Sequence, residues 1–138
     1  MLLEPWQLDL VDSCRSATLA TIDRTGTPSL VPVCYAYVEG RFVIAIDEKP
    51  KSGRPLARVR NIDADPRVTL LIDHYDDDWT RLAWLRIEGT AVAIGAAAWP
   101  GAVAALRSRY HQYEQMAIER LPLIVITPGR AVAWRWRA

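Results

Sequence analysis

The sequence contains little cysteine and little lysine, and each scarcity narrows the class of protein. Of its 138 residues only Cys14 and Cys34 are cysteines. Two cysteines so far apart supply neither a disulfide framework nor a zinc-ligand pattern, so we expect two buried thiols in a reducing cytosol. Only Lys49 and Lys51 are lysines, and the net charge is +1. That balance argues against a general nucleic-acid-binding surface and leaves a local basic site as the alternative.

Other patterns are missing altogether. No apolar run approaches the length that a bilayer-spanning helix needs, and the first residues carry Glu4 and Asp9 without a basic n-region. We therefore expect a cytoplasmic protein that contacts no membrane. The glycine motifs of dinucleotide and phosphate-loop proteins and the nucleophile elbow are also absent. His74 lies among several aspartates, but adjacent loop residues rarely converge on one ion, so we expect no metal site.

The sequence does have a cluster of basic residues between two apolar runs, Phe42–Ile46 and Val68–Ile72. No acidic residue interrupts this basic segment, which spans residues 49–60. Its cations are Lys49, Lys51, Arg54, Arg58 and Arg60. Clustered cations and turn amides can hold an anionic ligand. A solvated surface loop is the alternative.

The pattern of apolar residues predicts a mainly β, α+β domain that spans residues 1–138. The Asp23-Arg24-Thr25-Gly26 tetrapeptide predicts a hairpin, Glu39-Gly40 a tight turn and Gly89 a β-bulge. Pro28 and Pro32 predict an edge or irregular strand, because proline cannot donate to a ladder. The expected helices are Pro5–Ser13, Pro55–Ile62 and a long Ala96–Arg120. The expected strands are Ala17–Ile22, Pro28–Val38, Arg41–Ile46, Val68–Asp73, Arg81–Ile94, Leu123–Thr127 and Arg130–Trp136, the last two forming a hairpin over Pro128-Gly129.

Several segments taken together resemble a known family. They are ATLATIDRTGTPSLVPV, RFVIAID, the basic segment, and LARVRNIDADPRVTLLID, whose Arg-Asn-Ile-x-x-Asp-Pro-Arg-Val core is the most specific part. This order resembles the pyridoxamine 5'-phosphate oxidase-like, FMN/F420-binding split-barrel oxidoreductases. The KPK loop and DHYDDDW resemble the subgroup described as F420-dependent. The resemblance covers residues 17–94 and implies an antiparallel split β-barrel that forms a homodimer, with cofactor clefts at the subunit interface.

The resemblance also implies a cofactor site. By position it assigns the cofactor phosphate to Arg58, Arg60 and Asn61, with Lys49, Lys51 and Arg54 extending the site outward. Pro32, Val33, Ala45 and Ile46 correspond to strand residues that line the ring. Tyr35, Tyr37 and Trp79 are candidates for the substrate side, and Trp79 is also counted among the cofactor-binding residues. Relatives have a shorter loop here and often lysine where Arg58 stands.

Charge matching favours one cofactor of this family over the other. FMN ends in a single phosphate, whereas coenzyme F420, an 8-hydroxy-5-deazaflavin, carries a phosphodiester and an oligoglutamate tail. Cations strung along the basic segment suit the longer anion, and arginine binds both phosphate and carboxylate. We therefore expect an F420-dependent oxidoreductase that transfers a hydride to a small conjugated or quinone-like substrate. An FMN-dependent oxidase or flavin reductase, or a non-catalytic carrier of F420 or a tetrapyrrole, are the alternatives.

Overall fold

The computed structural model describes residues 2–47 and 53–137, which build one antiparallel seven-stranded sheet. The strand order is β2-β1-β5-β6-β7-β4-β3, so β2 and β3 form its two edges. The prolines of β2 therefore lie on an edge strand, as expected. The strands are β1 (Ala17–Ile22), β2 (Pro28–Val33), β3 (Ala36–Val38), β4 (Arg41–Ala45), β5 (Arg67–His74), β6 (Ala83–Gly95) and β7 (Pro122–Arg135).

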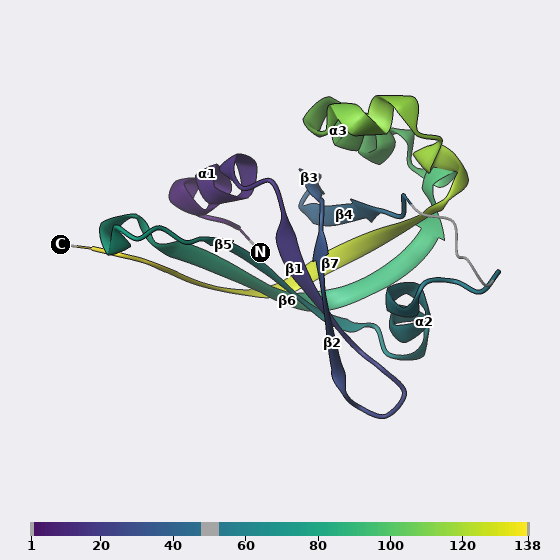
Figure 1. Ribbon diagram of the computed structural model, residues 1–138, viewed down its shortest axis with the longest axis horizontal. Helices are drawn as coiled ribbons and strands as arrows, with labels where there is room; N and C mark the ends of the chain where they lie inside the picture. Colours follow the sequence, from purple (N-terminus) through teal and green to yellow (C-terminus); the bar gives the residue numbers. More distant parts are fainter. Residues whose placement is uncertain (1, 48–52, 138) are drawn as a thin grey trace.

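Three α-helices and four short 3-10 helices accompany the sheet. Figure 1 shows α1 and α3 at the two ends of the long strands β6 and β7. α1 and α2 pack on one core through Leu10 and Val59, and α3 packs on another through Leu106. No helix in the described parts of the chain is long and apolar enough to cross a membrane. The helices are α1 (Pro5–Ser13), α2 (Ala57–Ala64), α3 (Pro100–Arg109), η1 (Trp79–Arg81), η2 (Ala96–Ala98), η3 (His111–Gln115) and η4 (Ile118–Arg120).

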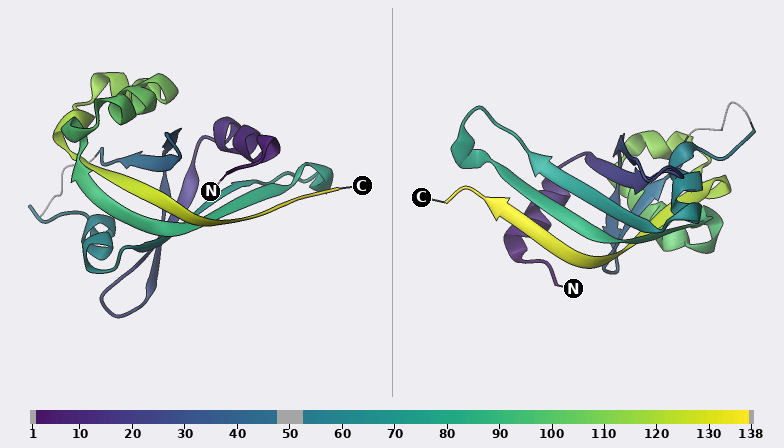
Figure 2. Two further views of the ribbon diagram at one scale, coloured as in Figure 1. Left: turned by 180° about the vertical axis from the view of Figure 1, so that it is seen from behind. Right: turned by 90° about the horizontal axis from the view of Figure 1, so that it is seen from below.

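The prediction of a final hairpin over Pro128-Gly129 was wrong. These residues lie inside β7, which pairs with β6 along its whole length, from Ala83 opposite Arg135 to Gly95 opposite Pro122. The register shifts between Glu88 and Gly89, which confirms the bulge expected at Gly89. Pro128-Gly129 forms the bulge on β7, opposite Gly89 of β6, and does not reverse the direction of the chain. Figure 2 shows β6 and β7 running side by side through the molecule.

The prediction of one strand over residues 28–38 was also wrong, because Cys34 and Tyr35 belong to neither strand and separate β2 from β3. β2 ends at one edge of the sheet and β3 begins at the other. Tyr35 is fully buried at this crossing, and its hydroxyl donates to the carbonyls of Val11 at 2.6 Å and Cys14 at 3.1 Å. The side chain is therefore fixed in the interior and is not available to a substrate.

The long helix expected over residues 96–120 is divided. Only Pro100–Arg109 is α-helical, with Pro100 at its start, where a missing amide costs nothing. Tyr110 leaves the helical conformation with φ −127° and ψ 103°, and its hydroxyl donates to the carbonyl of Arg15 at 2.9 Å. The apolar residues that follow come from η3 and η4. Their spacing fits a helix, but they pack as short separate turns.

The apolar side chains form two cores on the two faces of β4 and β7. Phe42 and Ile44 belong to the barrel core, which also contains Val59 of α2. Val43 and Ala45 face the other way, into a second core beneath α3 with Tyr110 and Tyr113. The alternation of a strand assigns successive residues of β4 to different cores.

Candidate functional site

A pocket of about 380 Å³ lies where β2 and β4 end, between the two cores. Its walls come from segments far apart in the sequence, including α2 and η3. The lining residues are Ser16, Val31, Pro32, Val33, Cys34, Ile44, Ala45, Asp47, Arg58 and Tyr113. Four of these, Pro32, Val33, Ala45 and Arg58, are residues that the sequence assigned to a cofactor site.

Arg58 is the charged feature of this pocket that bears most directly on a ligand. It stands in the first turn of α2. The N-cap residue of this helix is Leu56, whose side chain makes no capping hydrogen bond. Among the described residues, Nε of Arg58 is the buried side-chain nitrogen or oxygen without a hydrogen-bond partner. A buried, unpaired donor is costly, and a guanidinium donor is satisfied best by a carboxylate or phosphate. The first-turn amides of a helix add to that preference for an anion.

Other predicted residues of α2 do not line the pocket. Asn61 is 8% exposed and donates from Nδ2 to Thr21 Oγ1 at 3.0 Å, so it ties α2 to β1. Arg60 donates from Nη1 to the carbonyl of Pro55 at 2.5 Å. Arg54 is exposed ahead of the helix. Because a helix turns by 100° per residue, Arg58 and Arg60, which are two positions apart, point to different faces of α2.

The remaining predicted residues are not placed around the pocket. Ile46 is 2% exposed and packs in the barrel core. Lys49 and Lys51 lie outside the described residues. Trp79 belongs to η1, which follows β5, whereas α2 precedes β5. Eight strand residues hold the two ends about 25 Å apart, so within one chain Trp79 is separated from Arg58. Tyr37 packs on Phe42, with ring centroids 4.6 Å apart.

Sequence reasoning missed four polar residues of the pocket: Ser16, Cys34, Asp47 and Tyr113. Cys34 follows β2 at the crossing that was predicted to be continuous strand. Tyr113 had been counted as part of an amphipathic helix. Burial raises the pKa of the Tyr113 hydroxyl, and the nearby Cys34 and Asp47 act in the same direction. The hydroxyl is therefore a neutral donor throughout the ordinary pH range.

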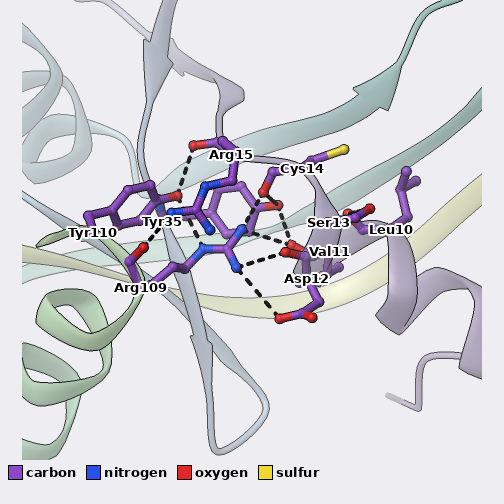
Figure 3. A network of polar contacts seen from close by, with 9 residues as sticks. All are labelled: Leu10, Val11, Asp12, Ser13, Cys14, Arg15, Tyr35, Arg109 and Tyr110. Atoms are coloured by element: carbon purple, nitrogen blue, oxygen red, sulfur yellow. Dashed lines mark hydrogen bonds and ion pairs between the residues drawn. The ribbon is translucent and has the colours of Figure 1, made fainter.

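A polar network joins the end of α3 to the end of α1 (Figure 3). Arg109, at the end of α3, donates to the carbonyls of Val11 and Asp12 at 3.1 and 3.0 Å and to that of Cys14. Its guanidinium also lies 4.9 Å from the ring centroid of Tyr35. Since the last carbonyls of a helix lack partners within it, Arg109 caps the C-terminus of α1.

The described part of the chain holds no group of three or more His, Cys, Asp and Glu side chains arranged to bind a metal. Nor do the pocket residues form a pair of closely spaced carboxylates for acid–base work. They offer a guanidinium, a neutral phenol, a thiol, the single carboxylate of Asp47 and apolar strand edges. That combination suits binding and orientation of a ligand that carries its own reactivity.

The pyridoxamine 5'-phosphate oxidase family model matches residues 3–135. The chain belongs to this family. Its fold, a mainly antiparallel sheet with three helices, is the split barrel that the sequence resemblance implied. Family membership therefore supports the fold class directly and leaves the individual activity open, because split-barrel proteins differ in what they bind.

Three solved structures share the family's split barrel. A conserved hypothetical protein from Mycobacterium tuberculosis has a TM-score of 0.78 at 23% identity, covering 98% of this chain and 86% of that chain. HutZ, the heme storage protein from Vibrio cholerae, has a TM-score of 0.71 at 16% identity, with 98% and 95% covered. A protein described as an F420 reductase has a TM-score of 0.66 at 18% identity, with 95% and 98% covered. At these identities the likeness shows the fold alone.

Proposed function

We propose that this protein is a cytosolic oxidoreductase that binds reduced coenzyme F420 beside Arg58 and transfers a hydride to a small conjugated or quinone-like substrate. The observation that carries the proposal is the buried Nε of Arg58, which has no partner in the described structure and borders a pocket. The basic residues 49–54 precede α2 in the chain and supply further cations for a polyanionic tail.

The residues of the pocket have different roles in binding the cofactor. Arg58 holds the phosphate, because guanidinium forms charge-assisted hydrogen bonds to its oxygens. Val33, Ile44 and Ala45 give the ring an apolar bed that excludes water. When bound, the deazaflavin supplies the hydride from ring C5. The chain's own residues orient it and keep the transfer site dry.

Replacing Arg58 by glutamine is expected to weaken F420 binding by roughly 30-fold, because a charge-assisted hydrogen bond contributes about 2 kcal/mol. Titration of the protein with F420, and in parallel with FMN, can be followed by tryptophan fluorescence quenching. The double variant Lys51→Gln/Arg58→Gln is expected to bind still more weakly and with less dependence on salt. Unchanged titration curves for the double variant would contradict the site assignment.

Arg24→Gln is the matched control for charge. Arg24 is exposed in the β1–β2 turn, so its removal lowers the net charge equally without touching the pocket. We expect its F420 affinity to equal that of the unmodified protein. A wild-type protein that binds FMN tightly and F420 weakly would overturn the cofactor choice and favour the FMN-dependent oxidase or flavin reductase.

A non-catalytic carrier is the second candidate, and the structural likeness to a heme storage protein favours it. The pocket has no paired carboxylates, which is compatible with storage, although hydride transfer needs no such pair. Heme titration followed by absorbance distinguishes the two functions. Tight heme binding without reduction of any quinone by reduced F420 would support the carrier.

We also propose that the protein is a homodimer. One outer face of β1, β2, β5 and β6 has a largely apolar groove of about 450 Å³, in which Leu30 is 68% exposed. A second copy of the chain would cover this exposed apolar side chain. The groove residues are Thr18, Ala20, Leu30, Thr69, Leu71, Asp73, Trp84 and Arg86. Leu30→Glu is expected to shift the mass in solution, measured by light scattering, from dimer to monomer.

A further inference from the structure

Tyr113 is a buried polar side chain whose position the proposed function does not explain. It is 4% exposed, yet it lines the pocket together with Cys34 and Asp47. The Tyr113 hydroxyl is close enough to the Cys34 side chain to hydrogen-bond with it. Because both neighbours of the hydroxyl also line the pocket, this end of Tyr113 is the part that faces it.

Tyr113 and Arg58 approach the pocket from different cores. Tyr113 belongs to the core beneath α3, whereas α2 packs through Val59 on the barrel core. β4 separates the two cores, with Ile44 on one face and Ala45 on the other, and both of these residues line the pocket. A ligand that fills the pocket would therefore meet a cation on one wall and a phenol on another.

The backbone and ring of Tyr113 are held in place before any ligand binds. Its amide donates to the carbonyl of Tyr110 at 3.0 Å, and its own carbonyl accepts from Nε of Arg107 at 3.1 Å. Its ring packs edge-on against Tyr110, with centroids 5.6 Å apart and an interplanar angle of 65°. Tyr110 in turn belongs to the network in Figure 3, where its hydroxyl binds the Arg15 carbonyl. Such restraint lowers the entropic cost of a ligand contact.

The hydroxyl of Tyr113 can act as a hydrogen-bond donor. Burial keeps it neutral, as the raised pKa of Tyr113 indicates. The hydrogen-bond partner that the structure offers it is the Cys34 thiol, and sulfur is a weak hydrogen-bond acceptor. A carbonyl or ionised hydroxyl oxygen on a ligand is a stronger acceptor. Turning the O–H bond from sulfur towards such an oxygen therefore exchanges a weak hydrogen bond for a better one.

We propose that Tyr113 is a specificity-determining residue that donates a hydrogen bond to an oxygen on the ring system of the bound ligand. The inference rests on the proposed function, since Arg58 would hold the phosphate of the same molecule. The ligand class is a flavin or deazaflavin with acceptor oxygens on its ring. Cys34 is a positioning residue that keeps the hydroxyl directed into the pocket when no ligand is bound.

Tyr113→Phe is the direct test, because it keeps the ring and removes only the hydroxyl. We expect F420 to bind about 10-fold more weakly, as for the loss of one neutral hydrogen bond. We also expect the absorption maximum of bound F420 to shift towards that of the free cofactor. A purely structural role for the hydroxyl would alter thermal stability without moving the absorption maximum.

Tyr75→Phe is the matched control, since Tyr75 is 67% exposed and does not line the pocket. Its affinity and spectrum should be those of the unmodified protein. If Tyr113→Phe fails to fold, Cys34→Ala replaces it, with an expected loss of about 3-fold in affinity as the hydroxyl loses its anchor.

The outcomes separate the two proposals. Unchanged affinity and spectrum in Tyr113→Phe, together with weakened binding in Arg58→Gln, would overturn the role of Tyr113 and leave the proposed function standing. If the unmodified protein binds neither F420 nor FMN, both proposals fail. Reduced affinity with an unshifted absorption maximum would also overturn the inference, because the hydroxyl would then act at a distance from the ring.

Discussion

Gly89→Ala is expected to lower the free energy of unfolding by about 3 kcal/mol. Gly89 lies on β6 opposite the bulged residues of β7, and a methyl group added there would overlap the carbonyl oxygen of Thr127 on β7. The contact is with backbone, so no side chain can rotate away, and the two strands must separate locally. Urea denaturation followed by circular dichroism measures the loss.

Gly95→Ala provides the control on the same strand. Nothing lies within 4 Å of the position that its methyl group would take, and its φ of −65° suits any residue. We expect a change below about 0.5 kcal/mol, as for an ordinary surface substitution. Equal stability of the two variants would mean that the strands at Gly89 are not as close as the structure shows.

Arg109→Met is expected to cost about 3 kcal/mol and to lower the melting temperature by roughly 10 °C. Methionine retains the length of the side chain but leaves the carbonyl of Asp12 without its donor. The carbonyls of Val11 and Cys14 lose the guanidinium and keep only the Tyr35 hydroxyl. The side chain of Arg109 is 13% exposed, so water cannot freely replace it. Differential scanning calorimetry provides the measurement.

Arg24→Met serves as the control for the same chemical change. Arg24 is exposed in a turn, and we expect its melting temperature to stay within about 2 °C of the unmodified protein. A melting temperature for Arg109→Met that matches this control would show that the cap on α1 contributes nothing to stability.

Local signals in the sequence identified most strand ends. The Asp23–Gly26 turn formed as expected, with Gly26 at φ 81° and the Asp23 carboxylate accepting from the amides of Thr25 and Thr27. Glu39 and Gly40 both have positive φ, as a tight hairpin turn requires. These features depend on a few adjacent residues, so they can be predicted from those residues alone.

The errors arose where distant contacts decide the structure. Pro128-Gly129 has the composition of a turn, but β6 continues opposite it and holds β7 as one strand. Tyr35 interrupts a strand because its hydroxyl is bound by the end of α1. Helix spacing over residues 96–120 did not reveal that Tyr110 would be held by Arg15. Tertiary packing overrides local preference in all three cases.

The candidate site divides in the same way. The resemblance to a family pointed to Pro32, Val33, Ala45 and Arg58, and the structure brings these four to one pocket. Asn61 was assigned to the same site, but its amide is used within the fold. Tyr113 is distant in sequence from all of them and follows no motif. Its place at the pocket depends on how α3 ends, which no local pattern records.

The paired strands β6 and β7 belong to both cores, since Leu85 and Ile87 face the barrel core while Leu123 and Val125 face the core beneath α3. One pair of strands, with a single register shift between Glu88 and Gly89, therefore links the two cores. Opening of either core would expose apolar residues of the other core to water. The backbone amides of β6 and β7 should therefore exchange with deuterium through a shared, global unfolding event. The two walls of the pocket would then persist or vanish together, and its shape should change little until the whole domain unfolds.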